Sequence, residues 1–178
     1  MNRLGEYLTV KHGWAFKGEH FASDGELCLL TPGNFYESGG FKENSGKERY
    51  YSGKFPKEYL CKKGDLVIAM TEQAAGLLGS AAIVPEDDKY LHNQRIGLVH
   101  CSKRIDKMYA YYLFMTSSVR RQLEGSASGT KVKHTSPERI YDVLVDVPDD
   151  IGSQQAIASL LWEIDQLTSI NNQINDNL

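Results

Sequence analysis

The chain has 178 residues, of which 41% are hydrophobic and 24% charged, values typical of one globular domain with room for an appendage. Its formal net charge of −3 argues against a uniformly basic nucleic-acid binder. No apolar run approaches the roughly 20 residues of a membrane helix, and the N-terminus lacks the apolar core of a signal peptide. The three cysteines are far apart, which fits neither a disulfide framework nor a CxxC metal site. We therefore expect a cytoplasmic protein with reduced thiols.

The charges are unevenly distributed along the chain. Residues 1–88 carry 10 Lys and Arg against 13 Asp and Glu, residues 89–134 carry 9 against 2, and residues 135–178 carry 1 against 8. A basic middle followed by an acidic end favours two surfaces with different partners. The alternative is that these acids and bases pair within the fold, and charge alone does not decide between the two.

In the first half of the chain, apolar runs bounded by glycine and proline predict short strands. The residues up to Phe16 predict a short helix or strand that ends in a turn at His12–Gly13. The polar stretch 33–57 contains six aromatic residues, which is too many for a linker and favours a structured functional loop. A buried strand is expected at residues 26–31, a turn followed by a buried strand at residues 62–70, and further strands at residues 80–85 and 93–101.

The second half predicts two helices and a strand between them. Apolar residues at helical spacing predict a helix over residues 106–123, with Asp106 as its N-cap. Alternating apolar and polar residues predict a half-buried strand over residues 139–148, which Pro148 ends. The whole pattern predicts an α/β globule of α+β type over residues 1–150, followed by a long helix over residues 151–178.

The C-terminal helix carries a heptad seam. From about Ser153 its apolar residues are spaced alternately three and four apart, with an asparagine at one a position: Ile157, Leu160, Ile164, Leu167, Asn171, Ile174 and Leu178. A helix that covers its own domain usually has a wider apolar stripe, whereas a lone buried Asn sets register and strand number. We expect this helix to pair with another helix; the alternative is a terminal helix packed on its own domain.

The segment GSASGTKVKHTSPER (125–139) has the composition of a phosphate loop but not its spacing. Thr130 stands where a P-loop needs its second glycine, and Val132 stands where it needs Ser or Thr. No strand precedes Gly125, as a nucleophile elbow requires. The five histidines lack paired metal-ligand spacing. We therefore expect a non-catalytic protein that needs no cofactor or metal.

The order of segments resembles the specificity subunit of type I restriction–modification systems. The resemblance extends over essentially the whole chain, and the ordered set carries it rather than any one motif. Its segments are GDLVIAM (64–70), GSAAIV (79–84), NQRIGLV (93–99), SGTKVKHTSPERIYDVLVDVP (128–148) and GSQQAIASLLWEIDQL (152–167).

This resemblance implies a non-catalytic subunit with two parts. A target recognition domain, here residues 1–150, reads one half of a bipartite sequence in double-stranded DNA. A spacer helix, here residues 151–178, pairs as a coiled coil and docks the methyltransferase and restriction subunits. Full-length members carry two of each part, so the chain resembles one half of such a subunit. If two identical halves pair as a homodimer, the recognised sequence is a palindrome with a nonspecific gap.

With that family in view, we expect DNA contacts from four segments, because cations suit phosphates while Arg, Asn and Gln suit base edges. In an extended segment two lysines two residues apart point to the same side, and their neighbours add donors: Lys131 and Lys133 with Ser128, Thr130 and His134. The expected base-contacting residues are Asn93, Gln94, Arg95, Thr71, Gln73, Asn34, Tyr36 and Arg49, with Lys47 nearby. Arg120 and Arg121 either hold phosphates or complement a helix C-terminus.

Each of these expectations has a structural alternative. Residues 128–134 also suit a solvated loop, residues 93–95 a turn that opens a strand, and Tyr36 the core. Two other functions stay open as well. One is an interaction or decoy module that pairs through its helix with restriction–modification subunits and reads no DNA. The other is a metal nuclease built on Asp65 and the segment 87–89, although residues 85–88 are more typical of a surface turn.

Overall fold

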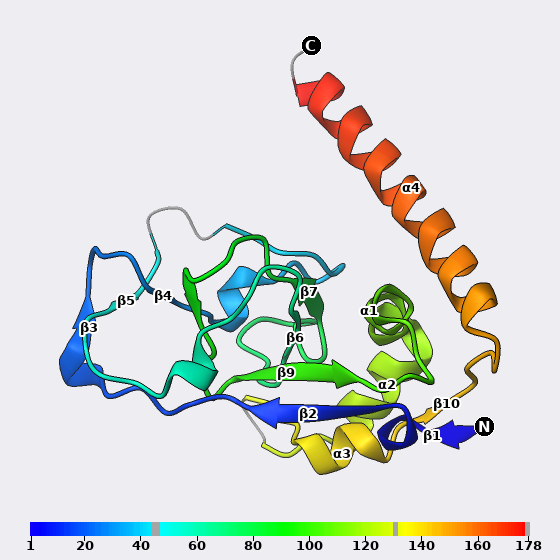
Figure 1. Ribbon diagram of the computed structural model, residues 1–178, viewed down its shortest axis with the longest axis horizontal. Helices are drawn as coiled ribbons and strands as arrows, with labels where there is room; N and C mark the ends of the chain where they lie inside the picture. The colour runs from blue at the N-terminus through cyan, green and yellow to red at the C-terminus, as the bar shows by residue number, and fades with distance from the viewer. Residues whose placement is uncertain (44–46, 130–131, 177–178) are drawn as a thin grey trace.

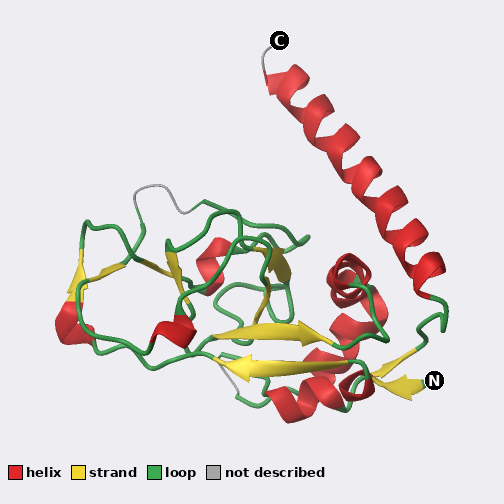
Figure 2. Cartoon of the chain, in the orientation of Figure 1, coloured by secondary structure: helices red, strands yellow, loops and turns green. Residues whose placement is uncertain are grey.

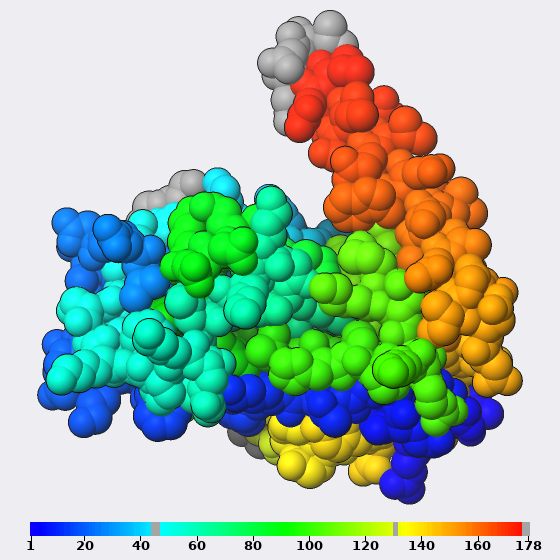
Figure 3. All heavy atoms as spheres, in the orientation of Figure 1, coloured from blue at the N-terminus to red at the C-terminus, as the bar shows by residue number. Residues whose placement is uncertain are grey.

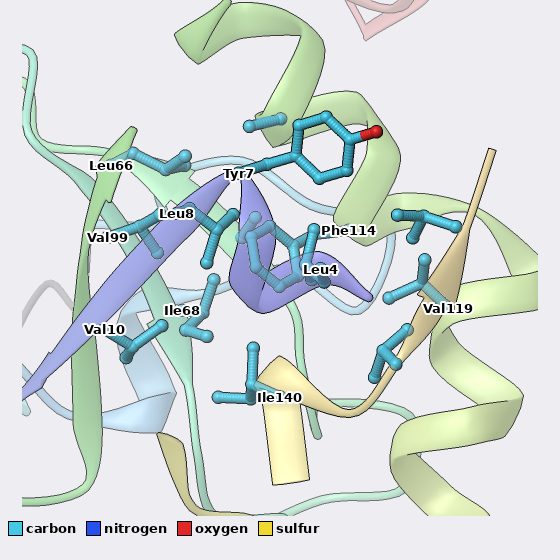
Figure 4. Close-up of a cluster of buried hydrophobic side chains, with 14 of the residues drawn as sticks. Leu4, Tyr7, Leu8, Val10, Leu66, Ile68, Val99, Phe114, Val119 and Ile140 are labelled. Carbon is cyan, nitrogen blue, oxygen red and sulfur yellow. The ribbon is translucent and has the colours of Figure 1, made fainter. Parts of the chain in front are cut away.

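The strand β6 (Leu66–Ala69) is buried on both faces and lies at the centre of the fold. The computed structural model describes residues 1–43, 47–129 and 132–176. Leu66 and Ile68 pack into one apolar cluster, shown in Figure 4, while Val67 and Ala69 pack into a second. Because side chains alternate between the two faces of a strand, an unbroken apolar run is what two buried faces require.

β6 belongs to a four-stranded antiparallel sheet in the order β2-β9-β6-β7. The other three strands are β2 (Leu8–His12), β9 (Ile96–Cys101) and β7 (Ala81–Ile83). Each lies within a segment where the sequence predicts a strand or a short helix or strand, although β9 begins three residues later than expected. Residues 93–95 form a turn instead.

A second sheet of very short strands draws the stretch 33–57 into the fold. Its order is β3-β5-β4-β8, and only β4 and β8 are parallel. A separate ribbon joins the N-terminus to the end of the globule. The strands of these two sheets are β3 (Phe21–Ala22), β5 (Tyr50–Tyr51), β4 (Cys28–Leu29), β8 (Tyr90–Leu91), β1 (Asn2–Arg3) and β10 (Leu144–Val145). The single-turn 3₁₀ helices are η1 (Leu4–Glu6), η2 (Gly18–His20), η3 (Pro32–Asn34) and η4 (Lys57–Tyr59).

Three short helices gather at the end of the main sheet that lies nearest the N-terminus of the chain. A fourth helix projects from the globule (Figure 2). The short helices are α1 (Lys107–Met115), α2 (Ser117–Ser126) and α3 (Pro137–Tyr141). The long helix α4 (Ile151–Asp176) begins beside α1 and extends well beyond it (Figures 1 and 3). None of the described helices is long and apolar enough to cross a membrane. The mixed α+β architecture with a long C-terminal helix agrees with the sequence-based expectation.

The helix expected over residues 106–123 is divided in two. The expected cap is confirmed, because the Asp106 side chain accepts from the Tyr109 amide at 2.9 Å. Thr116 then leaves the helical conformation, with φ −66° and ψ 143°. Its hydroxyl accepts from the Val119 amide at 3.4 Å and so caps a new helix. A threonine can stop one helix and start the next because its hydroxyl replaces a missing backbone partner.

The strand expected over residues 139–148 is largely wrong. The first part of that segment is the end of α3, and only Leu144–Val145 pair as a strand, with β1. The cause is local: Ser136 accepts from the Arg139 amide as an N-cap, and Pro137 occupies the first helical position. A capping serine followed by proline favours a helix start, which here outweighs the alternating pattern that follows.

The base of α4 is held to the globule by one buried glutamine. Gln154 is fully buried, accepts from the Asp106 amide at 2.8 Å and donates to the carbonyls of Arg104 (3.1 Å) and Pro148 (2.7 Å). Asp150 caps the helix by accepting from the Ser153 amide at 2.8 Å. The Gln154 amide group therefore joins α4, the start of α1 and the segment that leads into α4.

The Gln154→Ala substitution is expected to lower the free energy of unfolding by about 2–3 kcal/mol, because it leaves buried backbone groups without partners. Urea denaturation followed by circular dichroism measures the change. The matched control is Gln155→Ala, which removes the same side chain from an exposed neighbouring position and is expected to change stability by less than about 0.5 kcal/mol. Equal effects of the two substitutions would contradict the anchoring role.

Candidate functional site

Six of the residues that the sequence proposes for base or phosphate contact meet at one hollow. The hollow has a volume of about 940 Å³ and lies between the loop after β6, the turn before β9 and the stretch 33–57. It is lined by Tyr36, Arg49, Gln73, Asn93, Gln94 and Arg95. These residues are up to 59 positions apart in the sequence. The fold therefore brings together side chains from segments that are distant in the chain.

The hollow combines cations with aromatic rings. Its described lining includes four basic side chains, Lys42, Lys47, Arg49 and Arg95, but only one acidic side chain, Glu37. Two of the cations lie over rings: Lys42 Nζ is 5.6 Å from the centre of the Tyr36 ring, and Arg49 is 6.0 Å from that of Phe21. A ring beneath a cation attracts it and limits its orientations. The hollow is therefore a positively charged surface with partly ordered cations.

The turn at residues 93–95 is fixed through its backbone, which leaves side chains free to contact a ligand. The Gln94 amide donates to the Trp14 carbonyl at 3.0 Å, and the Arg95 carbonyl accepts from the Met70 amide at 2.9 Å. Gln94 and Arg95 have exposed side chains. Gly13 permits this packing, since a Cβ there would lie 2.0 Å from the Asn93 carbonyl oxygen.

His92 supports the same turn from inside the protein. Its Nε2 donates to the Ile96 carbonyl at 2.8 Å, and within the described part of the chain its Nδ1 has no hydrogen-bond partner. Burial lowers the pKa of His92 to about 4, so the ring is neutral at physiological pH. The histidine is thus a buried structural residue beside the site.

The loop after β6 contributes Gln73, while its neighbours have structural contacts. Thr71 is buried, and its hydroxyl lies 3.0 Å from His134 Nδ1. Glu72 lies 3.7 Å from Lys133 Nζ. Gln73 is exposed and lines the hollow. Of the two residues that the sequence proposes here as base contacts, Gln73 is therefore exposed at the hollow, whereas Thr71 is buried.

The two ends of the segment 128–134 are joined by an isolated antiparallel bridge between Ser128 and His134. The amide of each of Ser128 and His134 donates to the carbonyl of the other, at 3.0 and 2.8 Å. The Ser128 hydroxyl accepts from Arg139 at 2.7 Å, and the Lys133 carbonyl accepts from the Glu72 amide at 2.9 Å. Thr130 and Lys131 lie outside the described residues. The described residues of this segment do not line the hollow, so any contact they make lies beside it.

Asn34 has a structural role that its position in a polar loop did not reveal. It is only 2% exposed, its Oδ1 accepts from the Thr31 amide at 2.9 Å, and its Nδ2 donates to the Lys42 carbonyl at 3.3 Å. These bonds cap η3 and hold Lys42 at the hollow, so we remove Asn34 from the proposed contact set. Conversely, sequence reasoning missed Lys42, although it lies in the aromatic stretch, next to Phe41.

The carboxylates of the nuclease alternative hold turns instead. Asp65 accepts from the Lys62 amide and Asp87 from the Lys63 amide, both at 2.8 Å. Lys89 pairs with Glu86 at 2.6 Å. In the described residues no group of three or more His, Cys, Asp or Glu is arranged to hold a metal ion. The arrangement gives the nuclease alternative no support.

A second surface lies on α4. One face of the helix packs on the globule through Ala158, which is buried, and through Asp165, which accepts from the Tyr112 hydroxyl at 2.8 Å. The heptad seam lies on another face and is exposed along its described length: Ile157, Leu160, Ile164, Leu167, Asn171 and Ile174. Leu178 lies outside the described residues. The helix therefore packs on its own domain and still leaves its seam uncovered.

Comparison with known proteins identifies relatives across the full chain. A family model described as "Type I restriction modification DNA specificity domain" matches residues 1–178. A curated relative, the type I restriction enzyme MjaVIII specificity subunit of Methanocaldococcus jannaschii, is 25% identical over 170 residues, which cover 94% of this chain and 40% of the relative. The chain thus spans about two fifths of that relative's length.

Solved structures share the fold. The S subunit of a type I restriction–modification system from M. genitalium has a TM-score of 0.62 at 16% identity, covering 99% of this chain and 43% of that one. The HsdS subunit of Thermoanaerobacter tengcongensis has a TM-score of 0.61 at 15% identity, covering 97% and 38%. A chain from a study of the assembly and conformational transition of the type I R-M system reaches 0.68 at 14% identity, covering 97% and 40%.

The burial of His92 predicts a pH dependence of stability. Its pKa is about 4 in the folded protein against 6.5 for the free side chain. Between these values the unfolded chain binds a proton that the folded chain does not. Acidification from pH 6.5 to 4 is therefore expected to lower the free energy of unfolding by up to about 3 kcal/mol. In His92→Gln, which keeps a donor for the Ile96 carbonyl, this component is absent; an identical pH profile in both proteins would contradict the assignment.

Proposed function

The chain belongs to the type I restriction modification DNA specificity family, and on that premise we propose that it is a non-catalytic DNA-reading module. Residues 1–150 recognise one half of a bipartite sequence in double-stranded DNA. The helix over residues 151–178 pairs with a second copy and docks the methyltransferase and restriction subunits. The module works in the cytoplasm, where its DNA target lies.

The observation that carries this proposal is the meeting of three loops at one basic hollow. Arg pairs with guanine, and Asn or Gln with adenine, in the major groove. Asn93, Gln94, Arg95 and Gln73 supply those groups from two adjacent loops. Lys42, Lys47 and Arg49 supply charge for phosphates. A protein with a net charge of −3 that concentrates cations in one place has the charge distribution expected for a localised DNA contact.

The segment 128–134 is proposed as a second phosphate contact. Lys131 and Lys133 supply its charges, with Ser128, Thr130 and His134 as neighbouring donors. Lys133 is held near Glu72 at 3.7 Å, so its interaction with a phosphate competes with that carboxylate. We therefore assign Lys133 a smaller share of the affinity than the exposed cations of the hollow.

The uncovered seam of α4 supports pairing with a second copy. Its exposed apolar residues include Leu160 at 59% and Leu167 at 62% of their full exposure, which is costly for side chains of this size to leave in water. Two identical helices bury these residues against one another and place Asn171 opposite its counterpart. Two paired recognition domains then read a palindromic sequence with a gap.

The direct test of function is selection of bound sequences from random duplexes, with and without the methyltransferase subunit. The expected result is enrichment of a gapped palindrome. Recovery of random sequences under both conditions, together with intact binding to the methyltransferase subunit, would replace the DNA-reading function with that of an interaction or decoy module.

Substitutions in the hollow are expected to separate phosphate contacts from base contacts. Lys47→Ala with Arg49→Ala weakens binding to every duplex and reduces the slope of log affinity against log salt by at most about 2. Gln94→Ala leaves that slope unchanged and lowers discrimination at one base pair by about 1–3 kcal/mol. The matched control is Lys62→Ala with Lys63→Ala, which removes two exposed cations just before β6, at the opposite end of the strand. If the control weakens binding as much as the first pair, the hollow is not the contact surface.

Substitutions on α4 are expected to change its association. Asn171→Leu removes the polar specifier and alters oligomer number or register. Ile164→Asp places a charge in the seam and is expected to give monomers in sedimentation equilibrium. Gln166→Asp introduces the same charge on the opposite side of the helix and is expected to leave association unchanged. A wild-type chain that is monomeric at all concentrations tested would contradict pairing through α4.

A further inference from the structure

The turn 72–76, which carries Gln73, is clamped at Gly76 by hydrogen bonds to both polar groups of that residue's backbone. Gly76 has φ +81°, a conformation that side-chain-bearing residues rarely adopt. Its amide donates to Glu72 Oε1 at 3.1 Å, and its carbonyl accepts from the guanidinium of Arg120. Both backbone polar groups of this glycine are therefore occupied by charged side chains. The segment between Glu72 and Gly76 contains Gln73, so its ends are fixed.

Arg120 reaches this turn from α2. Its guanidinium is half-buried and also lies 3.8 Å from Met115 Sδ. Burial lowers the pKa of Arg120, and the carboxylates of Glu124, Glu72 and Glu37 raise it. A guanidinium stays protonated in such surroundings. Because it is half-buried and already donates to the Gly76 carbonyl, it is a poor ligand for DNA phosphate.

Arg121 is the natural contrast on the same helix. Its side chain is exposed, and its Nε donates to the Ser117 carbonyl of its own helix at 3.2 Å. The two adjacent arginines, which the sequence alone treats alike, therefore have different roles. One holds a distant loop, and the other stays on the helix surface.

We propose that Arg120 is a positioning residue for DNA recognition, which fixes the turn 72–76 so that Gln73 meets a base edge in the hollow. The proposal rests on the DNA-reading function proposed above. A reader held in place before binding loses less conformational freedom when it binds, so its hydrogen bonds distinguish bases more sharply. Arg120 therefore acts on discrimination between sequences, whereas a phosphate contact acts on all sequences alike.

The test compares Arg120→Met with Arg121→Met, using the duplex selected by the wild-type chain and a scrambled duplex. Arg120→Met keeps most of the apolar stem and removes the clamp. It is expected to lower the ratio of specific to nonspecific affinity roughly tenfold, within the range of one lost base contact, with an unchanged salt slope. Arg120→Lys is expected to restore part of the ratio. Arg121→Met is expected to change neither quantity.

A double-mutant cycle with Gln73→Ala separates positioning from a general loss of structure. If Arg120 acts through Gln73, Arg120→Met has no further effect on discrimination in the Gln73→Ala background. Additive losses would overturn the proposal, as would a fall of about 1 in the salt slope, which marks a phosphate contact. Arg120→Lys serves the same cycle if Arg120→Met does not fold.

Hydrogen exchange of the Gly76 amide provides a measurement without DNA. It is expected to be faster in Arg120→Met and unchanged in Arg121→Met, because only the first loses the clamp. A wild-type chain without sequence-dependent binding overturns both the proposed function and the role of Arg120. Sequence-dependent wild-type binding with an unchanged ratio in Arg120→Met overturns the role of Arg120 alone.

Discussion

The burial of β6 on both faces is the constraint from which the rest of the structure follows. One face packs against the apolar cluster that includes Leu4 and Phe114. The other face packs against the second apolar cluster, which includes residues of the stretch 33–57. A strand held on two sides is rigid, and so is the point where it ends. The chain beyond it is fixed further, because the Met70 carbonyl accepts from the Thr135 amide and the Met70 amide donates to the Arg95 carbonyl. Both candidate reading loops are thus tied to Met70: one follows it in the chain, and the turn 93–95 is hydrogen-bonded to it through the Arg95 carbonyl.

In the turn 93–95, the backbone makes the contacts that hold the fold, and the side chains remain available to a ligand. The backbone of residues 93–95 is occupied by contacts with Trp14 and Met70, while the side chains of Gln94 and Arg95 stay exposed. Because the framework contacts are made by main-chain atoms, the exposed residues can change without loss of the fold. The recognition surface that we propose can therefore acquire new sequence preferences at little cost in stability.

The sequence predicts the individual helices and strands of this fold better than the long-range contacts between them. Apolar runs bounded by glycine locate β6 and β7, and the Asp106 cap locates the start of α1, because these signals are local. The strand expected over residues 139–148 failed where two local signals conflicted, and the Ser136–Pro137 helix start prevailed. The hollow itself depends on pairings such as Ala22 with Tyr50. No local pattern encodes such long-range contacts, so neither the burial of Asn34 nor the location of Lys42 was predictable.

The hydrogen bonds of Gln154 and Asp165 fix the angle at which α4 leaves the globule. Gln154 and Asp165 are separated by 11 residues, or about 16 Å along a helix that is ~39 Å long in all. A tilt of α4 by about 10° at its base would move its C-terminal end by roughly 7 Å, the length of about two base pairs of DNA. The hydrogen bond between Tyr112 and Asp165 resists that tilt. In the pairing that we propose, the angular stiffness of this one junction sets how closely the distance between the two half-sequences is defined.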